Sequence, residues 1–509
     1  MDNKNCEFIL DTNNLEKPNW EALDNNPYKI RRESHRSNNE DEVLVSVYIQ
    51  AYNRLEKTKK CLTAILENTK DINYELILVD NGSDDMKTLE YFKSIEHKKK
   101  IVRVTKNIGS GYPVGMTVNM CDGKYIVIVS NDVYVTYNWL QNLLNCMESD
   151  ETIGMVGPMS TNISNLQQPD NYVYTSYEKF QKDAKKFNEH SVPSKWQERL
   201  RLITVLAMYR KEVLKLVGYM DSAFLHDFGE DDLCARIRRA GYKMMLAGDT
   251  FVHHDHNISI GEDKNMEEFK KILAQGREAF QEKYYGLDAW NDILNFELTL
   301  FSNIYKAHSQ SPSILGIDIK CGQPILSLAN KLREQCIYNT QRYAFTTEAK
   351  YFSDLQYVCH GDNVKCDRIE YILEYYAQGS MDYIVLGEPI NTYHNPGKLL
   401  IKLLTILKEG GVLCFKLRNI TGVKTQLNLI GQISVVDDDI PTLITVEEMI
   451  NTLQALNIYE FQLKAEPYAF DHESINNIQH LANQLNQGED YEKIFNKLIT
   501  KDYCFCIRT

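Results

Sequence analysis

The sequence predicts an α/β protein with two domains, each built around a largely parallel sheet. Short apolar runs bounded by polar residues alternate with segments whose apolar residues recur at helical spacing, which is typical of βαβ units. This alternation occurs twice, and the polar segment 306–313 separates the two series. The 509 residues suffice for both series, at roughly 100–200 residues per domain.

The first series follows a polar leader, residues 1–42, for which we expect an irregular structure. From residue 43 to residue 305 the pattern predicts a first domain, which begins with VLVSVYIQ, a strand buried on both faces. Its strands are expected at 43–50, 74–80, 101–104, 124–130 and 243–247, and its helices at 55–68, 134–148, 195–217 and 231–240.

The segment KAHSQSPS, residues 306–313, predicts a linker, and residues 314–509 predict a second α/β domain. The strands of this domain are expected at 314–319, 382–388, 410–418 and 502–509, and its helices at 397–408 and 445–456.

Composition narrows the classes of function. The chain carries 57 Lys+Arg and 70 Asp+Glu, a net charge of −13, which argues against a nucleic-acid-binding protein because such affinity needs a basic surface. No segment reaches the ~20 apolar residues of a membrane helix, and the N-terminus shows no secretory signal pattern. The 12 Cys follow no CxxC metal spacing. We therefore expect a cytoplasmic protein with reduced thiols.

Polar residues follow two of the predicted strands, where parallel sheets bind their ligands. Asp80 opens a DNGS turn, and its carboxylate could accept the imide N–H of a uracil ring or could cap a helix. Asp132 closes the triplet that begins at Ser130. Beside a diphosphate this carboxylate suits Mg²⁺ or Mn²⁺, because hard cations prefer carboxylate oxygen, while a plain turn is the alternative.

Two further clusters lie near the end of the first domain. Glu230, Asp231 and Asp232 occupy the first turn of a predicted helix, where the helix dipole stabilises negative charge. Three adjacent carboxylates also repel one another, so one of them is a candidate for taking a proton from an acceptor hydroxyl. The segment FVHHDHN (251–257) carries three His within four residues, and one of these is a candidate metal ligand.

Together these clusters resemble the family 2 glycosyltransferases, which have the GT-A fold. The resemblance covers about residues 43–260 and rests on six ordered motifs: VSVYIQAYNR, LVDNGSDD, KNIGSGYPVGMTVN, GKYIVIVSNDV, EDDLCARIRRAGYK and AGDTFVHH. It implies a nucleotide-sugar donor, a divalent metal ion and transfer with inversion. The residues implied to contact the donor are Ala51, Tyr52, Asn53, Asp80, Gly109 and Asn131.

The same resemblance implies that Asp132 and His254 hold Mn²⁺ or Mg²⁺, with His253 as the rival histidine. Ser130 stands where the motif's first aspartate is common, so metal binding depends on Asp132. The catalytic base has two candidates. The acidic motif taken literally gives Asp231, which we favour, whereas counting back six residues from Arg236 gives Glu230.

The second domain resembles S-adenosylmethionine-dependent methyltransferases, through ILGIDIKCGQPILSLANKLRE (314–334) and through residues 381–419. Lys320 and Pro324 replace two of the three glycines of that family's cofactor loop, and their side chains should crowd the cofactor. We therefore expect the fold without firm S-adenosylmethionine binding. The remaining acids implied to face a cofactor are Asp318, Asp362 and Glu388.

The leading hypothesis is an inverting, metal-dependent glycosyltransferase with a non-catalytic methyltransferase-like domain. Its expected donor is UDP-linked, such as UDP-N-acetylhexosamine, and its acceptor is a cell-surface glycan or a Ser/Thr hydroxyl of a protein such as flagellin. A second copy of the chain is a further partner that the C-terminal domain could hold. The alternatives are a bifunctional glycosyl- and methyltransferase and a non-catalytic scaffold.

Overall fold

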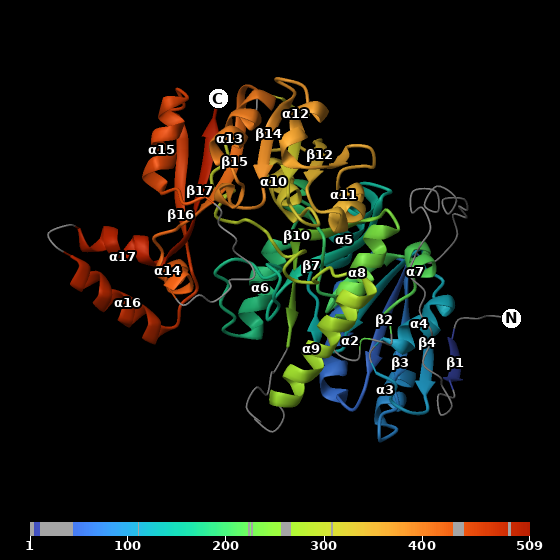
Figure 1. The fold of residues 1–509 in the computed structure, drawn as a ribbon. Helices are drawn as coiled ribbons and strands as arrows, with labels where there is room; N and C mark the ends of the chain where they lie inside the picture. Colours follow the sequence, from blue (N-terminus) through green and yellow to red (C-terminus); the bar gives the residue numbers. More distant parts are fainter. Residues whose placement is uncertain are drawn as a thin grey trace. The chain divides into compact units, whose positions relative to one another are not determined.

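The computed structural model contains two compact units, Met1–Leu294 and Asn295–Thr509, each built around its own mixed sheet (Figure 1). The predicted fold class, an α/β protein with two sheets, is confirmed. In the described part of the chain, every helix is too short or too polar to cross a bilayer. The structure describes residues 5–10, 44–109, 111–221, 224, 228–255, 266–306, 309–430, 442–486 and 490–509.

The sheet of the first unit has the strand order β1-β4-β3-β2-β5-β9-β7-β10-β6, with β8 on β10. Strands β1 to β5 pair in parallel, whereas β9 runs antiparallel to both of its neighbours. The strands are β1 (Asn5–Leu10), β2 (Val45–Ala51), β3 (Tyr74–Asp80), β4 (Lys99–Val104), β5 (Tyr125–Ser130), β6 (Val133–Tyr134), β7 (Ile153–Ser160), β8 (Trp196–Arg199), β9 (Leu206–Arg210) and β10 (Lys243–His254).

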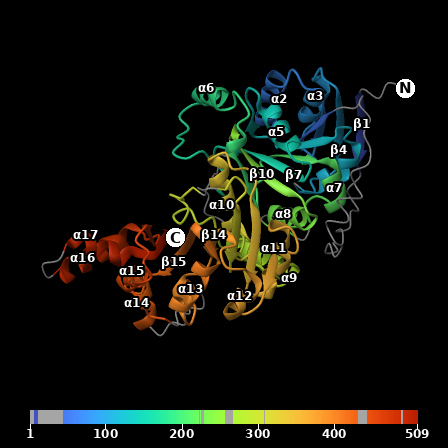
Figure 2. The same cartoon turned by 90° about the horizontal axis from the view of Figure 1, so that it is seen from above.

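Helices cover both faces of this sheet, which is why its central strands are buried along their whole length (Figure 2). One face packs against α2 (Leu55–Asn68), α3 (Lys87–Ser94) and α5 (Trp139–Glu148). The other face packs against α4 (Tyr112–Thr117), α7 (Lys211–Val217) and α8 (Gly229–Arg239). Helices α6 (Tyr177–Phe187) and α9 (Met266–Lys283) complete the unit.

Two predicted elements of this unit are wrong. Residues 195–217 do not form one helix, because β8 and β9 precede the short helix α7. The apolar run LITVLAMY (202–209) leads into β9, which is buried along its whole length, and such a run by itself does not distinguish a buried strand from a buried helix. The leader was expected to be irregular, yet Asn5–Leu10 forms β1 and pairs in parallel with β4. The rest of the leader, residues 11–42, lies outside the described residues.

Asp150 joins the start of β7 to the start of β10. Its carboxylate accepts the N–H of Thr152 at 2.8 Å and lies 2.7 Å from Nζ of Lys243. Partial burial acts to raise the pKa of Asp150, but the Lys243 ammonium and the Thr152 groups outweigh it and hold the pKa at about 2.

We therefore expect ionised Asp150 to stabilise the first unit above pH 4 and to lose this effect as pH falls from about 4 to 2, because the unfolded carboxyl takes up its proton first. The side chain is about one third exposed, so screening limits the effect to about 1 kcal/mol. Urea unfolding should show Asp150→Asn less stable than wild type at pH 7 and equal to it near pH 2. An equal deficit at both pH values would contradict the pKa assignment, and the exposed Asp71→Asn is the control.

The sheet of the second unit has the order β13-β12-β11-β14-β15-β17-β16, with only β17 antiparallel to β15 and β16. The strands are β11 (Ser313–Ile317), β12 (Gln341–Thr346), β13 (Val364–Cys366), β14 (Met381–Leu386), β15 (Leu407–Arg418), β16 (Phe461–Pro467) and β17 (Thr500–Arg508). The helices of at least seven residues are α10 (Gln323–Glu334), α11 (Phe352–Val358), α13 (Pro396–Ile406), α14 (Val423–Ile430), α15 (Val446–Ala455), α16 (His472–Leu485) and α17 (Tyr491–Ile499).

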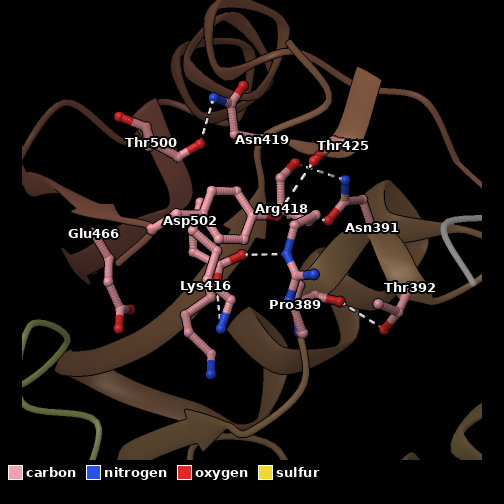
Figure 3. A network of polar contacts seen from close by, with 12 residues as sticks. Pro389, Asn391, Thr392, Lys416, Arg418, Asn419, Thr425, Glu466, Thr500 and Asp502 are labelled. Carbon is pink, nitrogen blue, oxygen red and sulfur yellow. Dashed lines mark hydrogen bonds and ion pairs between the residues drawn. The ribbon is translucent and has the colours of Figure 1, made fainter. Parts of the chain in front are cut away.

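A buried polar network closes the end of β15 against β17 (Figure 3). Nε of Arg418 lies 2.6 Å from the carboxylate of Asp502, which is 1% exposed. The Asn391 side chain accepts the N–H of Arg418 and donates to its carbonyl. The Asn419 side chain donates to two carbonyls, those of Lys497 and Thr500. These groups satisfy one another, so the network stabilises the fold without needing a ligand.

Candidate functional site

A pocket of about 420 Å³ lies at the carboxyl ends of β2 and β5 in the first unit. Its wall combines the ends of these strands with the residues that follow β2, the segment before β9 and the first turn of α8. The polar side chains that line it belong to Tyr48, Gln50, Tyr52, Arg54, Ser130, Asn131, Thr204, Tyr219 and Glu230. The pocket thus has hydrogen-bonding groups, one guanidinium and one carboxylate around a partly apolar floor.

The structure separates the two candidate bases. Glu230 lines the pocket, and its carboxylate accepts both the N–H of Thr204, at 2.9 Å, and the hydroxyl of the same residue. Asp231 is 2% exposed, and its Oδ1 lies 2.6 Å from Nε of Arg201. Burial raises the pKa of Asp231 to about 6, although the Arg201 guanidinium opposes this shift. The pocket therefore reaches Glu230, and Asp231 is enclosed with its arginine.

The third acid of the cluster, Asp232, is fully buried and has three partners. Its carboxylate lies 2.7 Å from Arg236 and 2.6 Å from Lys283, and it accepts the hydroxyl of Tyr284 at 2.7 Å. The repulsion among the three adjacent carboxylates is thus offset by separate partners for each one. These partners fix the first turn of α8 and hence the position of Glu230.

Asp132 and His254 come together, as a two-ligand metal site requires. Nε2 of His254 lies 3.6 Å from Oδ1 of Asp132. This distance falls within the roughly 3–4 Å that two donors about 2.1 Å from one ion can span. Nδ1 of His254 lies 3.3 Å from the carbonyl oxygen of Asn162, a contact that places the proton on Nδ1 and the lone pair on Nε2.

His253 points elsewhere. Its Nδ1 lies 2.8 Å from the hydroxyl of Thr161, and its ring stacks on Tyr174 at 4.4 Å between centroids. Burial lowers the pKa of His253 to about 4. Of the two histidines described in segment 251–257, His254 is therefore the one beside Asp132. Among the described residues no group of three His, Cys, Asp or Glu could hold a metal ion, so a cation at Asp132 and His254 would need further ligands such as phosphate or water oxygens.

Four of the residues expected to contact the donor line no part of the pocket: Ala51, Asn53, Asp80 and Gly109. Asp80 is fully buried, and its carboxylate accepts the N–H of Ser83 and pairs with Arg103 at 3.0 Å. The Asn53 side chain exchanges two hydrogen bonds with Asp84. Both residues hold the turn after β3 in place.

The other expected donor residues border the pocket. Tyr52 and Asn131 line it, and Asn131 donates to the hydroxyl of Thr58 at 3.0 Å. The carbonyl of Gly109 accepts the side chain of Gln50, which is itself part of the wall. Gln50 could have been predicted as a residue of the pocket wall, because it lies near the end of the predicted strand on the same face as Tyr48. Thr204 could not be predicted as a pocket residue, since the run LITVLAMY (202–209) does not show whether a strand or a helix follows or where it begins.

The loop after β11 in the second unit does not fit S-adenosylmethionine. Both carboxylate oxygens of Asp318 are engaged, one by the N–H and hydroxyl of Thr347 and the other by the hydroxyl of Tyr393 at 2.6 Å. Lys320 adopts φ of 53°, a conformation that favours the glycine it replaces.

The predicted grouping of cofactor-side acids in this unit is wrong in part. Asp362 precedes β13, whereas Asp318 and Glu388 follow β11 and β14. Because these strands are parallel, Asp362 lies at the amino ends of the strands, whereas Asp318 and Glu388 lie at their carboxyl ends.

Comparison with known proteins identifies the first unit. Residues 46–218 match the model of the family described as glycosyl transferase family 2, which confirms the resemblance over these residues, whereas the last two motifs, from residue 230 onward, lie outside the match. Curated relatives include a protein y4gI of Sinorhizobium fredii, described as uncharacterized, with 25% identity over 44% of this chain and 26% of its own length. An uncharacterized glycosyltransferase of Haemophilus influenzae is 25% identical over 22% of this chain and 36% of its own length. Another, of Methanocaldococcus jannaschii, is 28% identical over 23% of this chain and 41% of its own length. The chain thus spans about a quarter to two fifths of these relatives.

Similar solved structures include GalNAc-T7 with UDP, GalNAc and Mn²⁺ (15% identity, 42% of this chain and 44% of that one, TM-score 0.34). A mannosyltransferase of Pyrobaculum calidifontis with GDP-Man and Mn²⁺ is 16% identical over 51% of this chain and 78% of its own chain (TM-score 0.32). An S-adenosylmethionine-dependent methyltransferase of Archaeoglobus fulgidus is 16% identical over 46% of this chain and 99% of its own chain (TM-score 0.31).

Proposed function

We propose that the first unit is an inverting glycosyltransferase, which moves a sugar from a UDP-linked donor such as UDP-N-acetylhexosamine to an acceptor hydroxyl. The observation that carries this proposal is the pocket at the ends of β2 and β5, where Glu230 faces the space that Arg54 and Asn131 also line. The match of residues 46–218 to glycosyl transferase family 2 supports the same reaction class.

In this proposal Glu230 is the general base. Its carboxylate takes the proton of the acceptor hydroxyl while that oxygen forms a bond to the anomeric carbon of the donor. The bond from this carbon to the diphosphate breaks on the opposite face, so the configuration inverts and the nucleoside diphosphate leaves as an anion. Thr204 holds the carboxylate through two hydrogen bonds and so sets its direction.

The departing diphosphate needs positive charge. Arg54 on the pocket wall supplies one charge-assisted contact. Asp132 and His254 would hold a divalent cation such as Mn²⁺ or Mg²⁺, which when bound offsets the charge on the leaving phosphates. The buried carboxylates of Asp80 and Asp231 position neighbouring groups in this scheme, so neither touches the donor.

The experiment that tests the proposal is release of UDP from UDP-sugars by the full chain with Mn²⁺. We expect hydrolysis or transfer with at least one donor and its loss when Mn²⁺ is removed by a chelator. A chain that binds UDP-sugars but releases no UDP would favour the alternative of a non-catalytic scaffold.

The second unit is proposed to have no methyltransferase activity. We expect calorimetry of the full chain to show S-adenosylmethionine binding weaker than about 0.1 mM, because Asp318 is engaged by Thr347 and Tyr393, and because Pro324 provides no N–H at the start of α10. UDP in the same buffer is the positive control. Micromolar binding, or methyl transfer to the product, would establish the bifunctional alternative instead.

A further inference from the structure

The pairing of β6 with β10 decides which histidine lies beside Asp132. The ladder has two residue pairs, His253 with Tyr134 and His254 with Val133. In a sheet, a slip of one residue turns every side chain to the opposite face. Such a slip would place His253 opposite Val133, where His254 now lies. Because β6 contributes only two residues at the border of the sheet, its backbone ladder alone does little to fix this register.

Asp255 extends the ladder by one residue. Its N–H donates to the carbonyl of Asp132 at 2.8 Å, in the same register as the two pairs. Its carboxylate accepts the hydroxyl of Tyr134 at 2.8 Å. Tyr134 lies opposite His253, so its contact with Asp255, two residues further along, is a diagonal contact across the two strands. A slip of one residue would break both hydrogen bonds, so Asp255 favours the observed register.

Lys57 of α2 holds Asp255 in turn. Its Nζ donates to the carbonyl of Asp255 at 2.5 Å and lies 3.6 Å from the carboxylate. The two side chains are 21% and 26% exposed, so solvent screens this ion pair only in part. Lys57 lies in the first turn of α2, where the helix dipole disfavours a positive charge. The stability of the helix itself therefore does not account for a lysine at this position, whereas the contact with Asp255 does.

The same helix contacts the two residues before Asp132. The hydroxyl of Thr58 accepts a hydrogen bond from the side chain of Asn131 at 3.0 Å. Sγ of Cys61 lies 3.7 Å from the carbonyl oxygen of Ser130. Helix α2 therefore supports both chain segments that meet at the candidate cation site, the turn before β6 and the end of β10.

We propose that Asp255 is a positioning residue, which fixes the register of β6 against β10 and so holds His254 beside Asp132. Tyr134 and Lys57 anchor its carboxylate and its carbonyl. The inference rests on the proposed function, because it assigns a role toward the cation that Asp132 and His254 would hold. Asp255 is not assigned as a ligand, since the described residues contain no group of three His, Cys, Asp or Glu suited to a metal ion. Loss of either anchor should weaken cation binding more than nucleotide binding.

Binding of Mn²⁺ to the full chain in the presence of UDP tests the inference, with unbound Mn²⁺ measured by electron paramagnetic resonance. We expect Tyr134→Phe and Lys57→Met each to weaken Mn²⁺ binding about tenfold, a usual effect of losing a group that orients a metal ligand. Lys57→Arg keeps the positive charge and should restore most of the affinity. Lys60→Met, at an exposed lysine of the same helix, is the matched control and should bind Mn²⁺ as wild type does.

The affinity for UDP without Mn²⁺ separates a positioning role from a structural one. Tyr134→Phe and Lys57→Met should both bind metal-free UDP as wild type does, at a temperature well below the melting temperature of each variant. Unchanged Mn²⁺ affinity in both variants would overturn the inference, whatever their melting temperatures. Equal losses of Mn²⁺ binding and metal-free UDP binding would also overturn it, because the whole pocket would then be disturbed.

Asp132→Ala separates the failure of this inference from the failure of the proposed function. Equal Mn²⁺ binding by wild type and Asp132→Ala would overturn the cation site and the inference with it. Mn²⁺ binding that depends on Asp132 but not on Tyr134 or Lys57 would overturn the inference alone. Mn²⁺ binding that depends on all three residues, without release of UDP from any UDP-sugar, would support the positioning role and overturn the proposed catalysis.

Discussion

Glu230→Gln is expected to lower kcat by about 10²–10⁴ while the affinity for the UDP-sugar stays within a few-fold of wild type, because the amide cannot take the acceptor proton. Glutamine has nearly the same shape as glutamate, and its side-chain oxygen can still accept the N–H of Thr204. The fold should therefore be retained. Turnover under saturating donor and fluorescence titration with UDP measure the two quantities separately.

Asp231→Asn is the comparison that assigns the base. This substitution leaves Arg201 buried without its charged partner, so we expect a lower free energy of unfolding but a kcat per folded molecule within about tenfold of wild type. An active Glu230→Gln together with an inactive, folded Asp231→Asn would return the catalytic role to Asp231.

Asp132→Ala is expected to reduce Mn²⁺-dependent transfer by at least about 10²-fold, since the proposed cation would lose its one carboxylate from the protein. Asp132 follows β5 at the surface end of the strand, and its side chain is 13% exposed. The melting temperature should therefore change by a few degrees at most. The activity is measured across a Mn²⁺ titration. A weakened site would first raise the Mn²⁺ concentration needed for half-maximal activity, and only a more severe defect would lower the activity at saturating Mn²⁺.

His254→Ala serves as the paired variant, and the exposed Asp71→Ala serves as the control. If both His254→Ala and Asp132→Ala raise the Mn²⁺ midpoint while Asp71→Ala does not, the two residues share one cation. Full activity of Asp132→Ala at every Mn²⁺ concentration would show that the cation lies elsewhere.

The central strands could be predicted from the sequence because burial on both faces leaves an uninterrupted apolar run. YELILVD and KYIVIVS match β3 and β5 to within a residue. Residues 196–210 are wrongly predicted as helix because the run LITVLAMY suits a buried strand or a buried helix equally, and its strand conformation depends on pairing with β5 and β7. The strand at residues 5–10 could not be predicted, since β1 pairs with β4 through its backbone and the side chains of Glu7, Phe8 and Ile9 are exposed.

The sequence predicts that the candidate site lies at the ends of strands and at the start of a helix. It does not predict which side chains of these elements line the pocket. Adjacent carboxylates differ by about 100° around a helix, so a one-residue change of register decides whether Glu230 or Asp231 faces the pocket. That register depends on Arg201 and Thr204, which come from a different part of the chain. For the same reason the enclosure of Asp80 by Arg103 could not be read from the DNGS turn.

The pairing of β1 with β4 bears on how the protein behaves in concentrated solution. A shortened chain that starts after Leu10 would leave the backbone N–H and C=O groups of β4 unpaired along one border of the sheet. Unprotected borders of this kind recruit strands from other molecules and promote aggregation. Lys99, Lys100 and Arg103 on β4 give some electrostatic protection, yet the side chains of Lys99 and Lys100 are largely buried within the unit. Residues 5–10 therefore protect this border of the sheet against association with other molecules, and their removal should lower the solubility of the chain.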